Sequence, residues 1–101
     1  MATAFVQEFA IVDGDTSTTN YDGVAEELGR TAPEGLIVHT AGFDHDRGVF
    51  RIVDVWESRE AGQRFMDEKL MPIIERMAAE RGPDFSPPDA ESWYELHDVI
   101  R

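Results

Sequence analysis

Apolar and polar residues alternate along the chain in blocks that predict four strands and two helices. Apolar, aromatic and β-branched residues run together in four segments that are typical of strands: residues 4–12, 35–43, 49–57 and 91–100. A first helix is expected between Thr19 and Gly29, because the apolar side chains there recur every three or four residues. The proline-rich segment 82–90 is expected to form a loop.

The second helix has a clear start and an internal break. Ser58 directly follows the third strand and can cap the helix, while Glu60 suits the positive end of the helix dipole. An apolar stripe then occupies seven positions: Ala61, Phe65, Met66, Leu70, Ile73, Ile74 and Met77. Pro72 should kink or split this helix, or begin its second segment as that segment's first residue.

The order of these elements predicts an α+β fold of the ferredoxin-like type, βαββαβ. The short polar turn 44–48 makes the second and third strands an antiparallel hairpin. We expect a single domain over residues 1–101, with a four-stranded antiparallel sheet and both helices on one face. The third strand is apolar on both sides, so the other face of the sheet also needs a cover. No element remains to supply it, and we therefore expect a homodimer joined through the sheet faces.

Composition narrows the range of functions. The chain has 101 residues and no cysteine, which excludes a disulfide framework, thiol catalysis and a thiolate metal site. A formal net charge of −12 argues against binding to nucleic acid or to an anionic membrane. No apolar run approaches the roughly 20 residues that cross a bilayer, and no secretory signal is recognisable, so we expect a cytoplasmic protein. The sequence contains no nucleophile elbow, phosphate loop or nucleotide fingerprint.

Three adjoining motifs carry a family resemblance. They are Asp54-Val55-Trp56-Glu57-Ser58, Arg59-Glu60-Ala61 at the start of the second helix, and the break at Leu70-Met71-Pro72. With the element order, they make the chain resemble the dimeric α/β-barrel superfamily, and within it the antibiotic-biosynthesis-monooxygenase-like group. The resemblance implies ferredoxin-like protomers that pair as a barrel. Its members include cofactor-free oxygenases of aromatic polyketides, isomerases and cyclases, and haem-degrading enzymes, so the fold does not settle the chemistry.

Of these activities, haem degradation is disfavoured by the sequence of the second helix. In haem-degrading relatives, a histidine on the second helix binds iron shortly after the helix break. Glu75 lies near the corresponding position, and no histidine occurs between Asp46 and Leu96. We expect no cofactor and no metal site, since the cluster Asp44-His45-Asp46 has no identified fourth ligand.

His39 and Asp54 are the candidate catalytic residues. If Phe43 pairs with Gly48 across the turn, His39 lies opposite Ile52, Ile37 lies opposite Asp54, and His39 and Asp54 become diagonal neighbours on one face. A histidine beside a carboxylate could act as a general base towards an acidic C–H or phenolic proton. The alternative is a core histidine with one hydrogen-bond partner.

Five further residues are candidates for substrate binding: Phe43, Phe50, Trp56, Tyr21 and Arg51. The first three share the predicted face of His39, although Trp56 is more often core between the sheet and the second helix than a pocket wall. Tyr21 opens the first helix and could reach the mouth of a pocket. Arg51 could bind a substrate carboxylate or enolate, and its alternative is an ion pair across the dimer interface. Asp54 could orient His39, or accept hydrogen bonds from the first helix or from Arg51.

These observations lead to one main functional hypothesis and one alternative. The main hypothesis is a small cofactor-independent enzyme that acts on an apolar, aromatic or polyketide-like metabolite, by monooxygenation or by proton-transfer cyclisation or isomerisation. The alternative is a barrel that binds a small molecule, or serves as an accessory protein, without catalysis.

Overall fold

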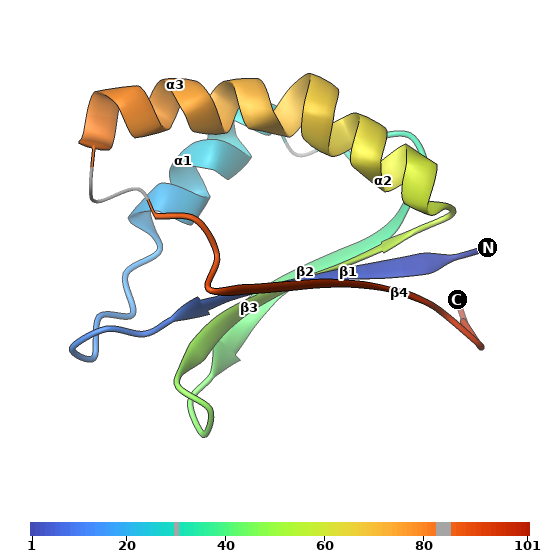
Figure 1. The fold of residues 1–101 in the computed structure, drawn as a ribbon, viewed down its shortest axis with the longest axis horizontal. Helices are drawn as coiled ribbons and strands as arrows, with labels where there is room; N and C mark the ends of the chain where they lie inside the picture. Colours follow the sequence, from blue (N-terminus) through green and yellow to red (C-terminus); the bar gives the residue numbers. More distant parts are fainter. Residues whose placement is uncertain (30, 83–85) are drawn as a thin grey trace.

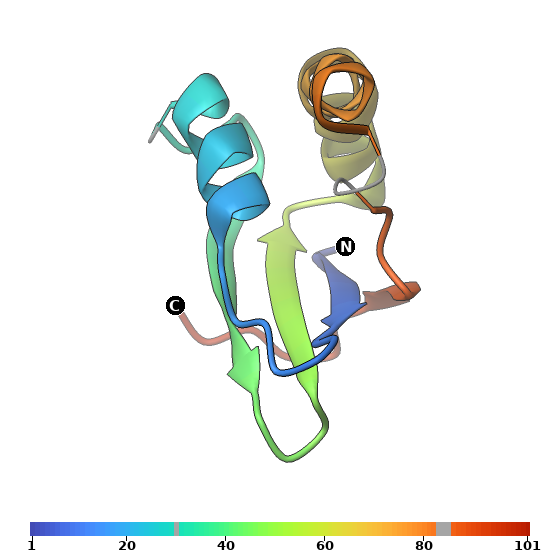
Figure 2. The ribbon, with the colours of Figure 1, turned by 90° about the vertical axis from the view of Figure 1, so that its left-hand side faces the viewer.

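The chain folds into two layers, a β-sheet and a layer of helices on one of its faces (Figures 1 and 2). The computed structural model describes residues 1–29, 31–82 and 86–101. In chain order, the elements are β1 (Thr3–Ala10), α1 (Thr19–Leu28), β2 (Leu36–Asp44), β3 (Val49–Trp56), α2 (Arg59–Phe65), the π-helical segment η1 (Met66–Leu70), α3 (Met71–Arg81) and β4 (Ala90–Glu95). This βαββαβ order confirms the predicted ferredoxin-like fold.

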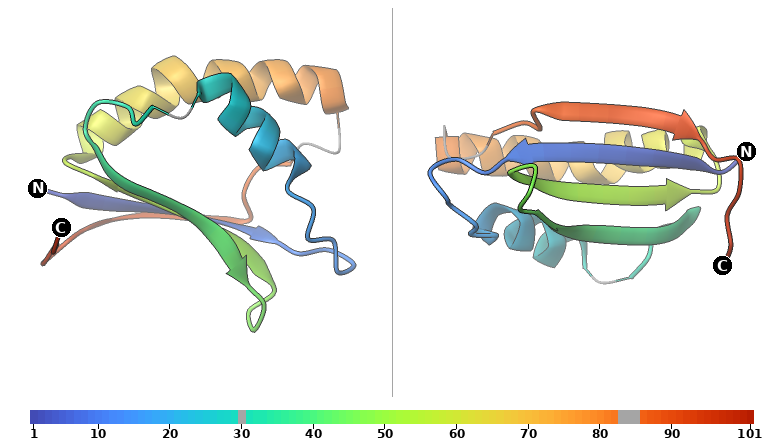
Figure 3. Two further views of the ribbon diagram at one scale, coloured as in Figure 1. Left: turned by 180° about the vertical axis from the view of Figure 1, so that it is seen from behind. Right: turned by 90° about the horizontal axis from the view of Figure 1, so that it is seen from below.

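The sheet has the strand order β2-β3-β1-β4, with antiparallel pairing at every step (Figure 3, right). Two strands are shorter than predicted, because a strand ends where its partner ends. The first predicted strand was to reach residue 12, but β1 ends at Ala10, opposite the first residue of β3. The last was to span 91–100, but β4 ends at Glu95, opposite Thr3, where β1 begins. Of the predicted loop 82–90, residues 83–85 lie outside the described residues.

The second helix of the prediction is one helical rod made of α2, η1 and α3 (Figure 1). Ser58 caps its start as expected, since its Oγ accepts a hydrogen bond from the Ala61 N–H at 3.1 Å. Pro72 lies in the first turn of α3, directly after η1. Proline has no N–H and crowds the carbonyl four residues earlier, and the wider π turn accommodates it. Within the described residues, no helix has the length and apolar character to cross a membrane.

The β2–β3 hairpin has a different register from the predicted one. Phe43 pairs with Phe50 and not with Gly48, because Gly48 takes a φ of +67° and closes the turn before β3 begins. The ladder is also interrupted at Ile37, which is the extra residue of a β-bulge and does not face Asp54. Between the bulge and the turn, the shift by two residues leaves the side chains of β2 on their predicted face, whereas Leu36, beyond the bulge, changes face and pairs with Trp56.

The core centres on Trp56, whose side chain is 1% exposed. Two glycines allow the start of α2 to pack closely against the indole. A Cβ on Gly62 would approach the Trp56 ring to 2.9 Å, and a Cβ on Gly35 would approach the Ala61 Cβ to 2.7 Å. Phe5 stacks on Trp93 with ring centroids 4.1 Å apart and extends the core across β1 and β4. This packing holds the sheet and α2 together at one end of the molecule.

Candidate active site

His39 and Asp54 face each other directly across the β2–β3 ladder. They are paired residues in the register, so their side chains leave the same face of the sheet. The Nδ1 atom of His39 contacts Oδ1 of Asp54. The carboxylate side chain is 13% exposed and the imidazole 40%, so Asp54 is the more buried partner and His39 the more accessible one. The sequence prediction brought the two residues together as diagonal neighbours, and the observed contact is more direct.

Tyr21 is the third member of this group. Its phenol oxygen lies 2.7 Å from Nε2 of His39, and the two ring planes are nearly parallel, with an interplanar angle of 6° and centroids 6.1 Å apart. The sequence prediction placed Tyr21 at a pocket mouth but missed its contact with His39. The available signal was its position on the apolar stripe of the first helix, which has to face the sheet. We call Tyr21, His39 and Asp54 the polar triad.

Hydrogen-bonding roles within the polar triad follow from the chemistry of its groups. An ionised Asp54 can only accept, so His39 donates through its Nδ1–H. The neutral imidazole then carries a lone pair on Nε2, which accepts the hydrogen bond of the Tyr21 hydroxyl. Both ring nitrogens of His39 are therefore engaged.

Electrostatics at the site favour a protonated His39. The hydrogen bond to Asp54 raises the pKa of His39 above its ordinary value of 6.5, and the negative charge of Asp54 adds to this effect. Partial burial of the imidazole lowers its pKa, but this effect is smaller than that of the hydrogen bond. The arrangement stabilises an imidazolium, which is the state that a proton acceptor reaches during a reaction.

Aromatic rings line the neighbourhood of the polar triad. Phe50 meets the Tyr21 ring edge-on, with centroids 5.4 Å apart and an interplanar angle of 70°. Phe43 lies 4.9 Å from Phe50 by centroid distance. Phe43 and Phe50 are paired across the hairpin, two pairs further along the ladder than His39 and Asp54 and on the same face. These rings form an apolar surface suited to a planar molecule.

Two predicted substrate-binding residues lie elsewhere. Trp56 shares the face of Asp54, but it is core: its side chain is buried and its ring lies 5.4 Å from Phe65 of α2. Within the described part of the chain, its buried Nε1–H has no hydrogen-bond partner. Arg51 lies on the opposite face of β3, because neighbouring strand residues point to opposite sides. The sheet therefore separates Arg51 from His39.

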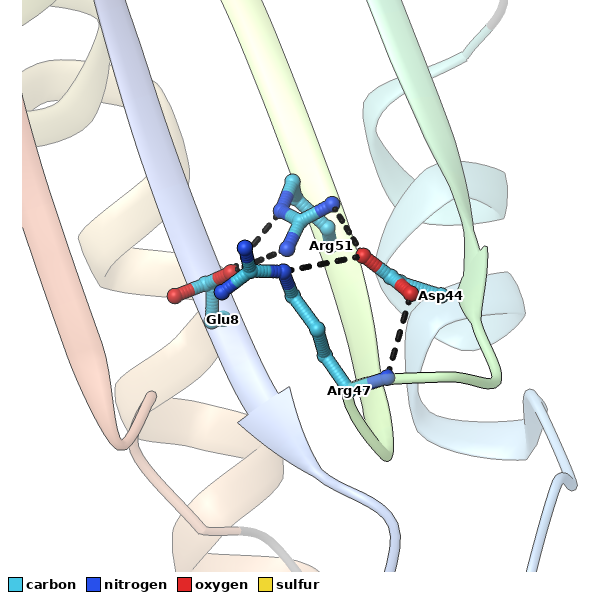
Figure 4. A network of polar contacts seen from close by, with 4 residues as sticks. All are labelled: Glu8, Asp44, Arg47 and Arg51. Atoms are coloured by element: carbon cyan, nitrogen blue, oxygen red, sulfur yellow. Dashed lines mark hydrogen bonds and ion pairs between the residues drawn. The ribbon is translucent and has the colours of Figure 1, made fainter.

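Arg51 forms an ion-pair network within its own chain (Figure 4). Its guanidinium lies 2.6 Å from Glu8 on β1 and 3.0 Å from Asp44 on β2. Arg47 lies 3.8 Å from the same Asp44 carboxylate. Hydrogen bonds from the Arg51 side chain and then from the Arg47 backbone N–H lower the pKa of Asp44. Within the single chain Arg51 pairs with Glu8 and Asp44, and an ion pair to a second copy stays a prediction.

A broad, shallow depression of about 640 Å³ lies around the hairpin and includes Asp44, His45 and Arg51 in its lining. It is not a convincing anion site, because two carboxylates already neutralise Arg51. Nor does it contain the polar triad. Among the residues that the structure describes, no group of three or more histidine and acidic side chains could hold a metal ion.

Comparisons with known proteins identify the fold. No model of a known protein family matches the chain, and no curated protein matches it. A solved structure of a Mycobacterium tuberculosis protein superposes with a TM-score of 0.70 at 16% identity, and the match covers 100% of both chains. A proposed antibiotic biosynthesis monooxygenase from Chloroflexus aurantiacus gives 0.66 at 14% identity, covering 100% of this chain and 98% of the other. The chain has the antibiotic biosynthesis monooxygenase fold.

The same fold is found in a protein of known chemical type. SnoaB, a cofactor-independent oxygenase from Streptomyces nogalater, matches with a TM-score of 0.62 at 15% identity, over 98% of this chain and 96% of SnoaB. At these identities, the antibiotic biosynthesis monooxygenase fold describes the backbone and leaves the chemistry open.

Proposed function

We propose that the protein is a small cofactor-independent enzyme that removes a proton from an aromatic or polyketide-like metabolite. The direct contact between His39 and Asp54 on the aromatic-lined face carries this proposal. A histidine held by a carboxylate can accept a proton and become a stabilised imidazolium. The raised pKa of His39 is consistent with that role.

The substrate class follows from what surrounds the polar triad. Tyr21, Phe43 and Phe50 offer ring faces and edges against which a planar ligand can stack. A polyketide-like or phenolic molecule also has C–H or O–H groups acidic enough to lose a proton to an imidazole. The resulting anion can react with oxygen or close a ring. The cofactor-independent oxygenase SnoaB, which shares the fold, supports the oxygenation branch.

The proposal includes a homodimer joined through the sheet face that the helices leave uncovered. Apolar residues from all four strands share this face by register: Ala4, Val6, Val38, Val53, Val55 and Tyr94. Val38 is 47% exposed and Tyr94 50% exposed in the single chain. A second copy would cover these side chains, and the pairing of Arg51 with Glu8 and Asp44 reduces the unpaired charge at the interface.

The test is turnover of a panel of hydroxylated polycyclic aromatics and β-diketones, followed by oxygen uptake and product analysis in air and under nitrogen. Oxygenation requires air, whereas cyclisation or isomerisation proceeds in both atmospheres. His39→Ala and Asp54→Asn should each lower kcat by about 10²-fold or more. His97→Ala, an exposed histidine near the C-terminus, is the matched control and should keep the rate. Ligand binding without any product would reject catalysis and favour the non-catalytic barrel.

A further inference from the structure

We infer that the candidate active site selects a neutral substrate, such as a phenolic ester or a β-diketone, and discriminates against relatives that carry a free carboxylate. This inference rests on the proposed function and adds the charge of the substrate to it. It is carried by the charges that surround the polar triad and by the charge that the reaction creates.

Negative charge lies on the sheet face that carries the polar triad. Asp54 contacts His39, and its side chain is 13% exposed. Glu91 of β4 pairs with Gln7 of β1, and Gln7 pairs with Ile52 of β3. Ile52 and Asp54 are two residues apart on one strand, so all of these side chains leave the same face. A carboxylate on the substrate would be repelled by Asp54 and Glu91, and partial burial of Asp54 reduces the screening by water.

The Glu91 carboxylate is also fixed in place. Its Oε2 accepts a hydrogen bond of 3.2 Å from Nε2 of Gln7, a residue that is 8% exposed. The amide of Gln7 is neutral, so it orients the carboxylate without cancelling its charge. The negative charge on this face therefore remains when the hydrogen bond forms.

Arginines that could bind a substrate carboxylate are engaged away from His39. Arg51 lies on the opposite face of the sheet, between two carboxylates (Figure 4). Arg59 lies 5.2 Å from the ring centroid of Trp93 on β4, at the sheet edge opposite to that of β2. Two further arginines contact side chains of α1: Arg76 with Glu27 at 2.9 Å and Arg81 with Asn20 at 2.7 Å. Within the described part of the chain, Asp54 is thus the charged group closest to His39.

The charge that the reaction creates points in the same direction. When a neutral substrate loses a proton, its C–H or O–H bond breaks, the bonding electrons stay on the substrate, and the proton goes to His39. The result is a monoanion beside an imidazolium that is paired with the Asp54 carboxylate. A substrate with a free carboxylate would end as a dianion, and the single imidazolium could not offset the second charge. Proton transfer therefore favours the neutral substrate.

Matched ligand pairs test the inference by binding alone. Methyl 6-hydroxy-2-naphthoate and its free acid share their rings and phenol and differ in one charge, and 4-acetoacetylbenzoic acid and its methyl ester form a second pair. Isothermal titration calorimetry at low salt should give each ester a Kd about 10-fold or more below that of its acid. The ratio should shrink at about 0.5 M salt, because salt screens charge repulsion. An acid that binds as tightly as its ester would overturn the inference.

Removal of the site charge gives the second measurement. Asp54→Asn should reduce the ratio of the two Kd values to within about 3-fold, because the amide no longer repels the acid. Asp98→Asn removes the same charge from an exposed position near the C-terminus and should keep the wild-type ratio. A ratio that Asp54→Asn leaves unchanged would overturn the inference.

An added cation should reverse the preference and keeps the inference testable if Asp54→Asn does not fold. Ala41 is exposed, and it lies between His39 and Phe43 on the same face of β2. Ala41→Arg should tighten binding of the acid by about 10-fold relative to the ester. Thr16→Arg adds the same charge in an exposed loop and should leave the ratio unchanged. Equal ratios in Ala41→Arg and wild type would contradict the inference.

Binding and turnover together separate the inference from the proposed function. Esters that bind in preference but give no product would uphold the charge selection and reject catalysis. Acids turned over with a kcat/KM equal to that of their esters would uphold catalysis and reject the charge selection. If no member of either pair binds, the aromatic surface is not a ligand site, and both proposals fall.

Discussion

His39 lies directly opposite Asp54 in the β2–β3 ladder, and this pairing depends on the β-bulge at Ile37. Beyond the bulge, Leu36 pairs with Trp56. If that register continued without interruption, the residue opposite Asp54 would be Val38. The single extra residue therefore selects histidine as the partner of the carboxylate. Bulges often re-aim a side chain next to a functional site, and this one does so by changing which residue meets Asp54.

The contact between His39 and Asp54 should make stability depend on pH. Because the pKa of His39 is raised in the folded protein, its protonated form stabilises the fold below the ordinary value of 6.5. This contribution should disappear as the pH rises through the raised pKa. Among the residues that the structure describes, Asp54 from β3 and Tyr21 from α1 contact the two ring nitrogens of His39. Urea unfolding midpoints between about pH 5 and pH 9 would measure the decline.

Asp54→Asn should flatten that decline, because the neutral amide no longer favours the imidazolium. Asp98→Asn, at an exposed position near the C-terminus, removes the same charge and should retain the wild-type slope. Equal slopes in wild type and Asp54→Asn would show that another group causes the pH dependence.

Gly62→Ala should destabilise the protein although alanine is the better helix former. The new Cβ would lie 2.9 Å from the Trp56 ring and 3.0 Å from Trp93, so the core would have to move. Overpacking of this kind costs about 1–3 kcal/mol in the free energy of unfolding, more than the roughly 1 kcal/mol gained from helix propensity. Urea denaturation would measure the difference. Arg64→Ala, at an exposed position of α2, should change stability little, and an equally stable Gly62→Ala would contradict the close packing.

Ser58→Ala should remove the cap of α2. The hydroxyl oxygen accepts a hydrogen bond from the backbone N–H of Ala61 at 3.1 Å, and alanine leaves that N–H without this partner. The expected loss in the free energy of unfolding is about 1 kcal/mol. Ser58→Asp should restore most of it, since aspartate also caps helices well. Thermal and urea unfolding of the pair would test the cap, and a Ser58→Asp variant as unstable as Ser58→Ala would argue against it.

Val53→Asp should disrupt the proposed homodimer. Val53 pairs with Val6 and Thr40 near the middle of the uncovered sheet face. A buried, unpaired carboxylate at this place would cost several kcal/mol of association free energy, so dimerisation should weaken by at least about 100-fold. Sedimentation velocity over a concentration series would measure the change. Thr16→Asp, in an exposed loop, adds the same charge away from the sheet and should leave the assembly intact.

Local patterns were sufficient for the larger part of the fold. The spacing of apolar residues located both helices, and the capping serine and Pro72 marked the start and the break of the second. Strand ends were harder to predict, because β1 and β4 end where their partners end and not where their own apolar residues end. The hairpin register failed for a related reason: the predicted pairing assigned Gly48 to the ladder, whereas its positive φ places it in the turn.

For the candidate site too, the sequence predicted one part and the tertiary structure decided the rest. The sequence placed a histidine and an aspartate in neighbouring strands, and an assumed hairpin register put them on one face. The observed register differs by two residues, which keeps that face because side chains alternate along a strand. The sequence also determined the element order and hence the fold. Only the tertiary structure decided that Tyr21 meets His39, that Trp56 is core, and that Arg51 pairs with Glu8 on the other side of the sheet. Those contacts join residues far apart in the chain, and their geometry depends on how α1 packs on the sheet and on one bulge in β2, which no local pattern encodes.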